Sequence, residues 1–90
     1  MNLYTVCYSK KFDMDLDRLA KSGQKYLVPR ILKACAVLAT GRSPGLKKIE
    51  GRDDAYRIRV GDYRILFSVD SVRHIVLVER VAHRKDVYRP

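Results

Sequence analysis

The hydrophobic period of this chain changes near Lys47, and that change constrains the fold more than any other feature of the sequence. Before it, apolar residues recur at helical spacing, as at Phe12, Leu16 and Leu19. After it, apolar and polar residues alternate, which is typical of strands buried on one face. A chain of 90 residues has room for one hydrophobic core. The sequence therefore predicts a single α+β domain that spans residues 1–90.

Two helices are expected within residues 9–41, after a first strand at residues 3–8. Ser9 can accept a hydrogen bond from the first turn of a helix, and Ser22-Gly23 can end that helix. The second helix carries apolar residues at Leu27, Ile31, Ala34, Cys35 and Leu38. Pro29 removes a backbone donor and clashes one turn back, so we expect this helix to begin near Pro29 or to kink there.

The sheet is expected to contain a tight hairpin. Alternating residues run through 56–60 and 63–69, and Gly61-Asp62 between them is a two-residue turn. Asp70-Ser71 suggests a further turn, followed by a last strand over residues 74–81. The expected element order is β-α-α-β-β-β, with the two N-terminal helices packed on one face of an antiparallel sheet. Because a helical hairpin should return the chain to the end it left, the first strand is expected to run antiparallel to the second.

A cluster of arginines follows from the register of this hairpin. A two-residue turn places Arg59 opposite Arg64, with Arg57 on the same face. The opposite face takes the apolar residues Tyr56, Ile58, Val60, Tyr63 and Ile65. Like charges across a sheet repel each other, so the cluster favours a bound anion such as phosphate. The alternative is a solvated face on which the arginines only discourage edge-to-edge aggregation.

The overall charge agrees with an anionic partner. Nineteen Lys and Arg against ten Asp and Glu give a net charge of +9, which favours nucleic acid or an acidic protein. The longest apolar run, at 34–39, has six residues and is too short to cross a bilayer. No secretory signal precedes the first strand. We therefore expect a soluble, cytoplasmic protein that does not bind a membrane.

Cofactor and metal chemistry find no support in the sequence. It contains no phosphate-binding loop, no Gly-x-Gly-x-x-Gly motif and no His-Glu-x-x-His motif. Cys7 and Cys35 lie among apolar neighbours, and we expect buried reduced thiols rather than a disulfide or a nucleophile. No cofactor and no metal are expected. His74, beside the turn at 70–73, is expected to be an exposed residue without a role.

The C-terminal segment combines an imidazole, a guanidinium and a phenol within six residues, at His83, Arg84 and Tyr88. Metal-free RNA cleavage needs a base for the 2′-hydroxyl, an acid for the leaving 5′-oxygen and cations for the crowded phosphate. His83 has the right chemistry for proton transfer near neutral pH. Tyr88 can take part in proton transfer only with cations beside it. The alternative is that a lone histidine and a terminal tyrosine carry no function.

Three segments resemble the RelE/ParE toxin superfamily. They are Leu46–Gly51, Ala55–Ile65 and His83–Tyr88, and the similarity extends over nearly the whole chain. The Tyr-Arg-x-Arg-x-Gly-Asp-Tyr-Arg block is shared by both branches of the superfamily. The His-Arg-x-Asp-Val-Tyr ending is similar to RelE-type ribonucleases, and ParE-type gyrase poisons generally lack it. This ending therefore favours the RelE branch.

The resemblance implies roles for individual residues. Arg64 and Arg84 would bind and stabilise the scissile phosphate, and Tyr88 would stack on a base or transfer a proton. His83 stands where family members have histidine or lysine, and it would act as acid or base. Four further basic residues would contact phosphates of the RNA backbone: Lys47, Lys48, Arg57 and Arg59.

The expected function is that of the toxin in a type II toxin–antitoxin pair. The resemblance implies a metal-independent endoribonuclease that cleaves messenger RNA in the ribosomal A site by attack of the 2′-hydroxyl. It also implies three partners: mRNA, ribosomal RNA and a cognate antitoxin whose helix or tail covers the basic face. Two rival functions are a ParE-like DNA gyrase inhibitor without nuclease activity and an inactive homologue that binds only its antitoxin.

Overall fold

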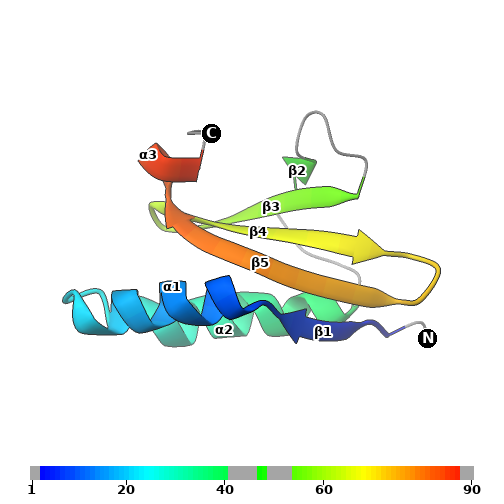
Figure 1. The fold of residues 1–90 in the computed structure, drawn as a ribbon, viewed down its shortest axis with the longest axis horizontal. Helices are drawn as coiled ribbons and strands as arrows, with labels where there is room; N and C mark the ends of the chain where they lie inside the picture. The colour runs from blue at the N-terminus through cyan, green and yellow to red at the C-terminus, as the bar shows by residue number, and fades with distance from the viewer. Residues whose placement is uncertain (1–2, 41–46, 49–53, 88–90) are drawn as a thin grey trace.

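The computed structural model describes residues 3–40, 47–48 and 54–87, and its two long helices lie on one side of a sheet (Figure 1). In chain order the elements are β1 (Thr5–Tyr8), α1 (Lys10–Lys21), α2 (Leu27–Val37), the 3₁₀ turn η1 (Leu38–Thr40), β2 (Lys47–Lys48), β3 (Ala55–Val60), β4 (Tyr63–Asp70), β5 (Ile75–His83) and α3 (Arg84–Val87). This order confirms the predicted α+β pattern, to which the structure adds η1, the two-residue β2 and the short α3. Within the described ranges no helix is long and apolar enough to cross a bilayer.

Helix α1 begins where the sequence predicts. The hydroxyl of Ser9 accepts a hydrogen bond from the Phe12 amide at 3.0 Å and donates one to the Glu79 carbonyl at 2.7 Å. One serine therefore caps α1 and also fastens it to β5. Phe12 and Leu19 are buried as expected, and Asp15 is buried between them. That buried carboxylate was not predicted, and its partners are described below.

Pro29 is compatible with α2 because it lies in the first turn of the helix. The helix begins at Leu27, and the amides of a first turn have no acceptor within the helix. The prediction that the helix begins near Pro29 is therefore confirmed. Leu27, Ile31 and Cys35 form its buried face, as their helical spacing predicts.

The sheet has five strands in the order β1-β5-β4-β3-β2 and is mixed rather than wholly antiparallel. Three neighbouring pairs are antiparallel, but β1 runs parallel to β5, with Thr5 opposite Ile75. The expectation that the first strand runs antiparallel to the second was wrong for β1 and β3, which run in the same direction.

The direction of α1 explains this difference. Figure 1 shows that α1 continues onward from the end of β1 and that only α2 runs back beside it. The amide of Tyr4 donates to the carbonyl of Ala39 at 2.8 Å, so the end of the helical segment lies beside the start of β1. The helical hairpin therefore returns the chain to the beginning of β1, and β3 then runs parallel to it.

The β3–β4 hairpin has the predicted register. Val60 pairs with Tyr63 across the turn, and Arg59 pairs with Arg64. Gly61 has φ 59°, a conformation that glycine adopts without steric cost and that suits the first position of a two-residue hairpin turn. The turn chemistry therefore fixes which side chains share a face.

The core lies between the helices and the sheet. Its largest fully buried side chains are Phe12, Ile31, Cys35, Ile65 and Val78. They come from both helices and from β4 and β5, so both layers contribute to one core. Burying each such apolar side chain contributes on the order of 1.5–3 kcal/mol. The opposite face of β3 and β4 is therefore left for polar residues.

Candidate functional site

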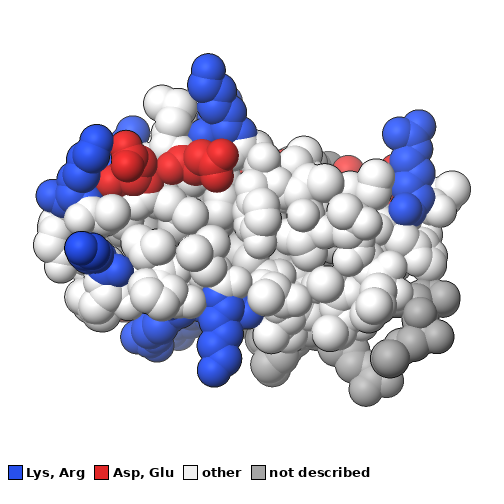
Figure 2. All heavy atoms as spheres, turned by 90° about the horizontal axis from the view of Figure 1, so that it is seen from below, with Lys and Arg blue, Asp and Glu red and all other residues white. Residues whose placement is uncertain are grey.

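Three arginines extend from the face of β3 and β4 that is turned away from α1 and α2. We call Arg57, Arg59 and Arg64 the arginine face. The observed register confirms that Arg59 and Arg64 are direct neighbours across the hairpin. Among the residues whose side chains the structure describes, no carboxylate pairs with Arg59 or Arg64. By contrast, both signs of charge occur on the helical side of the molecule (Figure 2).

The three guanidinium groups have different surroundings. Arg59 is exposed, and its Nε donates to the Gly61 carbonyl at 2.9 Å. Arg57 is half-buried and has an interaction partner. Arg64 is half-buried, and its Nη1 is fully covered without a hydrogen-bond acceptor among the described residues. A buried donor without an acceptor is costly, so Arg64 gains most from a bound anion.

The basic zone continues around the hairpin to α2. A hollow of about 410 Å³ lies between α2 and the turn, and Arg30, Lys33 and Arg59 line it. Arg59 thus belongs both to the arginine face and to this hollow. Positive charge is therefore available along a path that leads from the open face of the sheet to the helical side.

The structure describes the C-terminal segment as far as Val87. Arg84 begins α3, its side chain is exposed, and its amide donates to the Asp62 carbonyl at 2.8 Å. This bond holds the start of α3 at the turn of the β3–β4 hairpin, and Figure 1 shows α3 on the side of the sheet opposite α1 and α2. Tyr88 lies outside the described residues. Lys47 and Lys48 form β2 beside β3, and their side chains are likewise outside the description.

His83 lies on the other side of the sheet from Arg64. Register pairs His83 with Tyr63 and Arg64 with Ala82, and residues paired across strands share a face. The rings of Tyr63 and His83 meet edge to face, with centroids 5.4 Å apart. Two residues predicted to act together, His83 and Arg64, are therefore separated by the sheet, and His83 lies at the end of β5.

The imidazole of His83 has one nitrogen engaged. Its Nδ1 accepts a hydrogen bond from the Lys85 amide at 3.2 Å. In a neutral ring the proton then lies on Nε2, because the nitrogen that accepts a bond cannot carry it. In this arrangement Nε2 is the nitrogen that can donate a hydrogen bond. It is poorly placed to act there as a base.

Asp15 forms a tie between α1 and β5 that the sequence did not predict. Its carboxylate accepts bonds from Arg80 Nε at 2.8 Å, Arg80 Nη2 at 3.1 Å and the Val81 amide at 3.0 Å. The hydrogen bond and the charge of Asp15 raise the pKa of Arg80. A register shift between Leu66 and Phe67 locally distorts this part of the β4–β5 ladder. Sequence spacing gives no signal for a contact between residues 65 positions apart.

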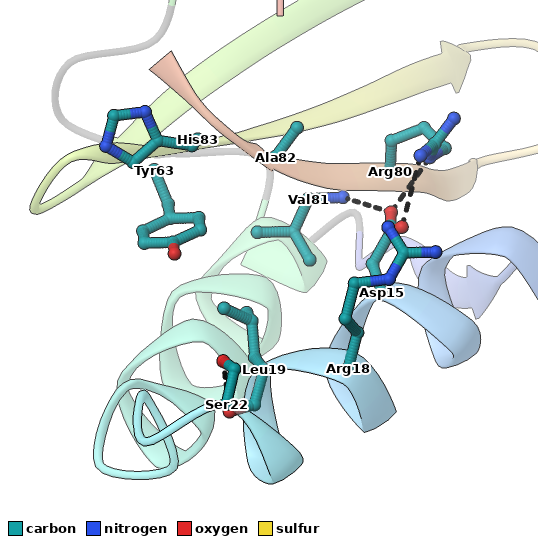
Figure 3. Close-up of a pocket in the computed structure, with 9 residues that line it drawn as sticks. All are labelled: Asp15, Arg18, Leu19, Ser22, Tyr63, Arg80, Val81, Ala82 and His83. Carbon is teal, nitrogen blue, oxygen red and sulfur yellow. Dashed lines mark hydrogen bonds and ion pairs between the residues drawn. The ribbon is translucent and has the colours of Figure 1, made fainter. Parts of the chain in front are cut away.

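A pocket of about 340 Å³ lies beside this tie, between α1 and the end of β5. Figure 3 shows its lining residues, with Tyr63 and His83 at one end and Arg18, Asp15 and Arg80 at the other. Among the residues described, no group of His, Cys, Asp and Glu has the arrangement of a metal site. Because the pocket lies beside α1 and the arginine face is turned away from α1, the two are separate polar regions on opposite sides of the sheet.

Comparison with known proteins identifies the family. A family model described as the ParE toxin of the type II toxin–antitoxin system parDE matches residues 6–88. This protein belongs to the RelE/ParE superfamily of type II toxins. The match begins within β1 and ends beyond α3, so it includes both long helices and the strands β2 to β5.

Individual relatives of this chain are themselves named as toxins. It is 32% identical to Toxin RelG of Mycobacterium tuberculosis over 96% of this chain and 97% of that protein. It is 46% identical to Toxin RelE3 of Methanocaldococcus jannaschii over 43 residues, a match that spans only 47% of that relative.

Solved structures agree with this assignment. The archaeal RelE–RelB complex from Pyrococcus horikoshii OT3 matches with TM-score 0.74 and 28% identity, over 93% of this chain and 97% of that one. The RelB–RelE antitoxin–toxin complex from Methanococcus jannaschii matches with TM-score 0.65 and 30% identity, over 91% and 94% of the two chains. Both structures are complexes of a toxin with an antitoxin.

Two minor expectations are corrected by the structure of the toxin. Cys35 is fully buried as predicted, but Cys7 is exposed, because alternate residues of a short edge strand point away from the core. His74 is half-buried and stacks on Tyr4 with ring centroids 4.8 Å apart, so it is not an exposed bystander. Its φ of 56° marks the tight connection into β5.

Proposed function

We propose that this toxin is a metal-independent endoribonuclease that cleaves messenger RNA in the ribosomal A site. One observation carries the proposal: Arg59 and Arg64 are adjacent, no described carboxylate pairs with either, and Arg64 holds a buried nitrogen that has no acceptor among the described residues. Phosphate supplies the acceptor oxygens that this cluster needs. Two relatives carry RelE names, and this supports RNA as the source of that phosphate.

In the proposed reaction the 2′-oxygen of one nucleotide attacks the adjacent phosphorus. The bond from phosphorus to the 5′-oxygen breaks, and a 2′,3′-cyclic phosphate and a free 5′-hydroxyl are formed. Arg64, Arg59 and Arg84 stabilise the charge that builds up on the phosphate oxygens, which is the largest contribution that a metal-free site can make. Lys47, Lys48 and Arg57 bind neighbouring phosphates of the RNA.

Two proton transfers accompany this step. The Nε2–H of His83 suits the acid that protonates the leaving 5′-oxygen, because Nδ1 already accepts the Lys85 amide. Tyr88, or water beside it, then takes the proton of the 2′-hydroxyl. Because His83 and Arg64 lie on opposite sides of the sheet, this role requires the scissile phosphate to lie at the end of β5, with the arginines on one side of it and Nε2 of His83 on the other.

We further propose that a cognate antitoxin neutralises the toxin by covering the arginine face. The net charge of +9 favours an acidic partner, and the related structures are toxin–antitoxin complexes. A co-purified antitoxin that leaves Arg57, Arg59 and Arg64 fully accessible would contradict neutralisation by occlusion.

One paired experiment tests the activity. The toxin is induced in a bacterium, the 5′ ends of messenger RNA are mapped, and DNA gyrase supercoiling is assayed with the same protein preparation. New 5′ ends within codons, with normal supercoiling, are expected. The control variant is Arg73→Ala. Arg73 is an exposed arginine that pairs with Asp70 in the turn between β4 and β5, and its loss should leave the new 5′ ends unchanged. Unchanged 5′ ends with the wild-type toxin would reject the nuclease.

Gyrase inhibition is the second candidate because the matching family model is described by its ParE members. In that case the arginine face would bind an acidic protein surface or DNA without breaking a bond. Inhibited supercoiling without new RNA ends would establish this alternative. Loss of both effects, with retained antitoxin binding, would identify an inactive homologue.

A further inference from the structure

The pocket between α1 and β5 offers a ligand its side chains rather than a free strand edge. Ser9 binds the Glu79 carbonyl and Asp15 binds the Val81 amide, so α1 occupies the edge of β5 beyond β1. The volume of about 340 Å³ is at the lower end of the range for sites that hold small organic molecules. The pocket therefore suits a compact ligand that is recognised by charge and shape.

The charge of this pocket is positive. Arg18, Arg80 and Asp15 line it, and Arg80 donates to both oxygens of the Asp15 carboxylate. Arg18 is exposed, and no carboxylate pairs with it among the described residues. One guanidinium group is therefore left for a ligand, and phosphate is an anion that such a group binds well.

The two ends of the pocket differ in chemistry. Figure 3 shows His83 at one end and Arg18 at the other, and the apolar side chains of Leu19 and Val81 also line the pocket. Nε2 of His83 can donate a hydrogen bond, because Nδ1 accepts one from the Lys85 amide. A ligand that fits both ends has an oxygen acceptor at one end and a phosphate at the other.

The proposed cleavage identifies the part of an RNA that has this pattern. The 5′-oxygen that leaves belongs to the nucleotide on the 3′ side of the broken bond, and His83 is the proposed donor of its proton. A proton donor must lie within hydrogen-bond reach of the atom it protonates. The leaving nucleotide is therefore expected on the side of the sheet where His83 and the pocket lie.

We propose that the pocket binds the nucleotide that follows the cleaved bond, with the 3′-phosphate of that nucleotide on Arg18. The RNA then passes the end of β5 in a defined direction. The nucleotide that carries the attacking 2′-hydroxyl lies toward the arginine face, and the leaving nucleotide lies toward α1. The inference rests on the proposed nuclease and on the role of His83 within it.

Single nucleotides test the pocket without any cleavage. The probes are the four nucleoside 3′-monophosphates, which have the free 5′-hydroxyl and the 3′-phosphate of the leaving nucleotide. Amide shifts in NMR spectra of the whole toxin should centre on Leu19, Val81 and His83. The four nucleosides without phosphate should bind about fivefold more weakly, because the contact with Arg18 is lost. Shifts centred on Arg59 and Arg64, or no binding of any probe at millimolar concentration, would overturn the inference.

Variants of α1 provide the matched comparison. Arg18→Glu should weaken binding of the nucleoside 3′-monophosphates about tenfold, because it replaces attraction by repulsion. Lys10→Glu changes the net charge equally but lies at the start of α1, outside the pocket, and should change binding less than about twofold. Equal weakening by the two variants would show that binding follows net charge and would overturn the inference.

A modified messenger RNA tests the direction of the strand. A methylphosphonate linkage carries no charge, and it is placed directly after the leaving nucleotide in a synthetic messenger RNA on the ribosome. Single-turnover cleavage by the wild type and by Lys10→Gln should slow about fivefold, whereas Arg18→Gln, which has already lost the contact, should not slow further. Equal slowing of all three proteins, or of none, would reject the assignment of this phosphate to Arg18.

The two kinds of experiment keep the pocket and the nuclease distinguishable. Nucleotide binding in the pocket without cleavage of messenger RNA by the wild type would reject the nuclease and the strand direction, and it would keep the pocket as a nucleotide site. Cleavage without nucleotide binding in the pocket would keep the nuclease and reject the pocket.

Discussion

Arg64 differs from the other arginines of its face because part of its guanidinium group is already desolvated. Its Nη1 is buried without an acceptor among the described residues, whereas Arg59 donates to the Gly61 carbonyl. The free-energy cost of removing this nitrogen from water therefore arises on folding, before a phosphate binds. Such preorganisation strengthens interactions with charge that develops in a transition state.

Replacing Arg64 should therefore reduce cleavage more than it reduces stability. We expect Arg64→Ala to lower the rate of RNA cleavage by about 100-fold or more, because transition-state stabilisation is lost. Its free energy of unfolding should change by less than about 1 kcal/mol, since an unsatisfied donor is removed with the side chain. Single-turnover cleavage and urea unfolding measure the two effects. Arg73→Ala serves as the control, and equal cleavage by both variants would contradict the role of Arg64.

His83 provides a test of proton transfer as distinct from charge. We expect His83→Ala to lower cleavage by ~10²–10⁴-fold while ribosome affinity stays nearly unchanged, because a positioned acid is lost. If the position transfers a proton, His83→Lys should be slow and its pH optimum should move upward, since an ammonium group releases its proton at higher pH. If it supplies only positive charge, the lysine variant should retain substantial activity. Wild-type cleavage by His83→Ala would leave Tyr88 as the leading candidate.

The two cysteines should differ sharply in reactivity. Burial raises the pKa of the Cys35 thiol to about 12 from an ordinary value of 9.0, and Cys7 is exposed. Iodoacetamide should therefore modify Cys7 and leave Cys35 unmodified in the folded toxin, as mass spectrometry of the intact protein would show. Modification of both cysteines at equal rates would contradict the burial of Cys35.

The same shift predicts a loss of stability at high pH. Between pH 9 and 12 the unfolded chain ionises Cys35 and the folded chain does not, so unfolding becomes more favourable as pH rises. This one group contributes up to about 1.4 kcal/mol per pH unit. Urea unfolding at pH 8 and pH 10 should show a steeper decline for the wild type than for Cys35→Ala. Parallel declines would contradict the assignment.

Among the elements, the contact between α1 and β5 depends on polar bonds as well as apolar packing. Ser9 fastens the start of α1 to the Glu79 carbonyl, and Asp15, nearly two turns further along, binds Arg80 and the Val81 amide. Where β1 ends, α1 therefore takes over the role of a neighbour to β5. On this side the far half of β5 therefore contacts a helix instead of a strand.

Removal of the Asp15 charge tests this contact. We expect Asp15→Asn to lower the free energy of unfolding by about 1.5–3 kcal/mol, because a buried carboxylate that accepts three hydrogen bonds is replaced by an amide. Asp17→Asn is a control on the same helix, since Asp17 forms only an exposed pair with Lys21 and should cost less than about 1 kcal/mol. Chemical denaturation measures both. Similar costs for the two variants would show that the tie contributes little.

At the scale of the whole molecule, the net charge of +9 is unevenly distributed. The arginine face and the hollow formed by Arg30, Lys33 and Arg59 form one basic zone, while both signs of charge occur on the helical side (Figure 2). A polyanion that follows this zone would displace counterions along its path, so its affinity should depend strongly on salt.

The slope of the logarithm of affinity against the logarithm of salt concentration becomes steeper with each phosphate that the protein binds. On a single-stranded RNA of fixed length, we expect the affinity of Arg59→Gln to fall with salt less steeply than that of the wild type, by about one unit of logarithmic slope. Lys10→Gln, outside the zone, should leave the slope unchanged. Filter binding at several salt concentrations measures both slopes. If the two variants lowered the slope equally, binding would depend on net charge rather than on this zone.

The local structure of the toxin is determined by its sequence to a large extent. The cap at Ser9, the position of Pro29 at the start of α2 and the turn at Gly61 all depend on the conformational preferences of a few neighbouring residues. The pairing of Arg59 with Arg64 follows from that turn, because two-residue hairpins fix register. The order of elements and the arginine face were therefore predictable.

Only the tertiary structure decides how distant segments meet. The parallel pairing of β1 with β5 depends on the direction in which α1 leaves β1, and periodicity does not contain that direction. The Asp15–Arg80 pair joins residues that are far apart in the chain, and it forms because packing of α1 brings one helix face to an open strand edge. The side of the sheet on which His83 lies depends on the register of β4 with β5, which a local bulge displaces. Contacts of this kind depend on the packing of whole elements, and the sequence of each element alone does not specify them.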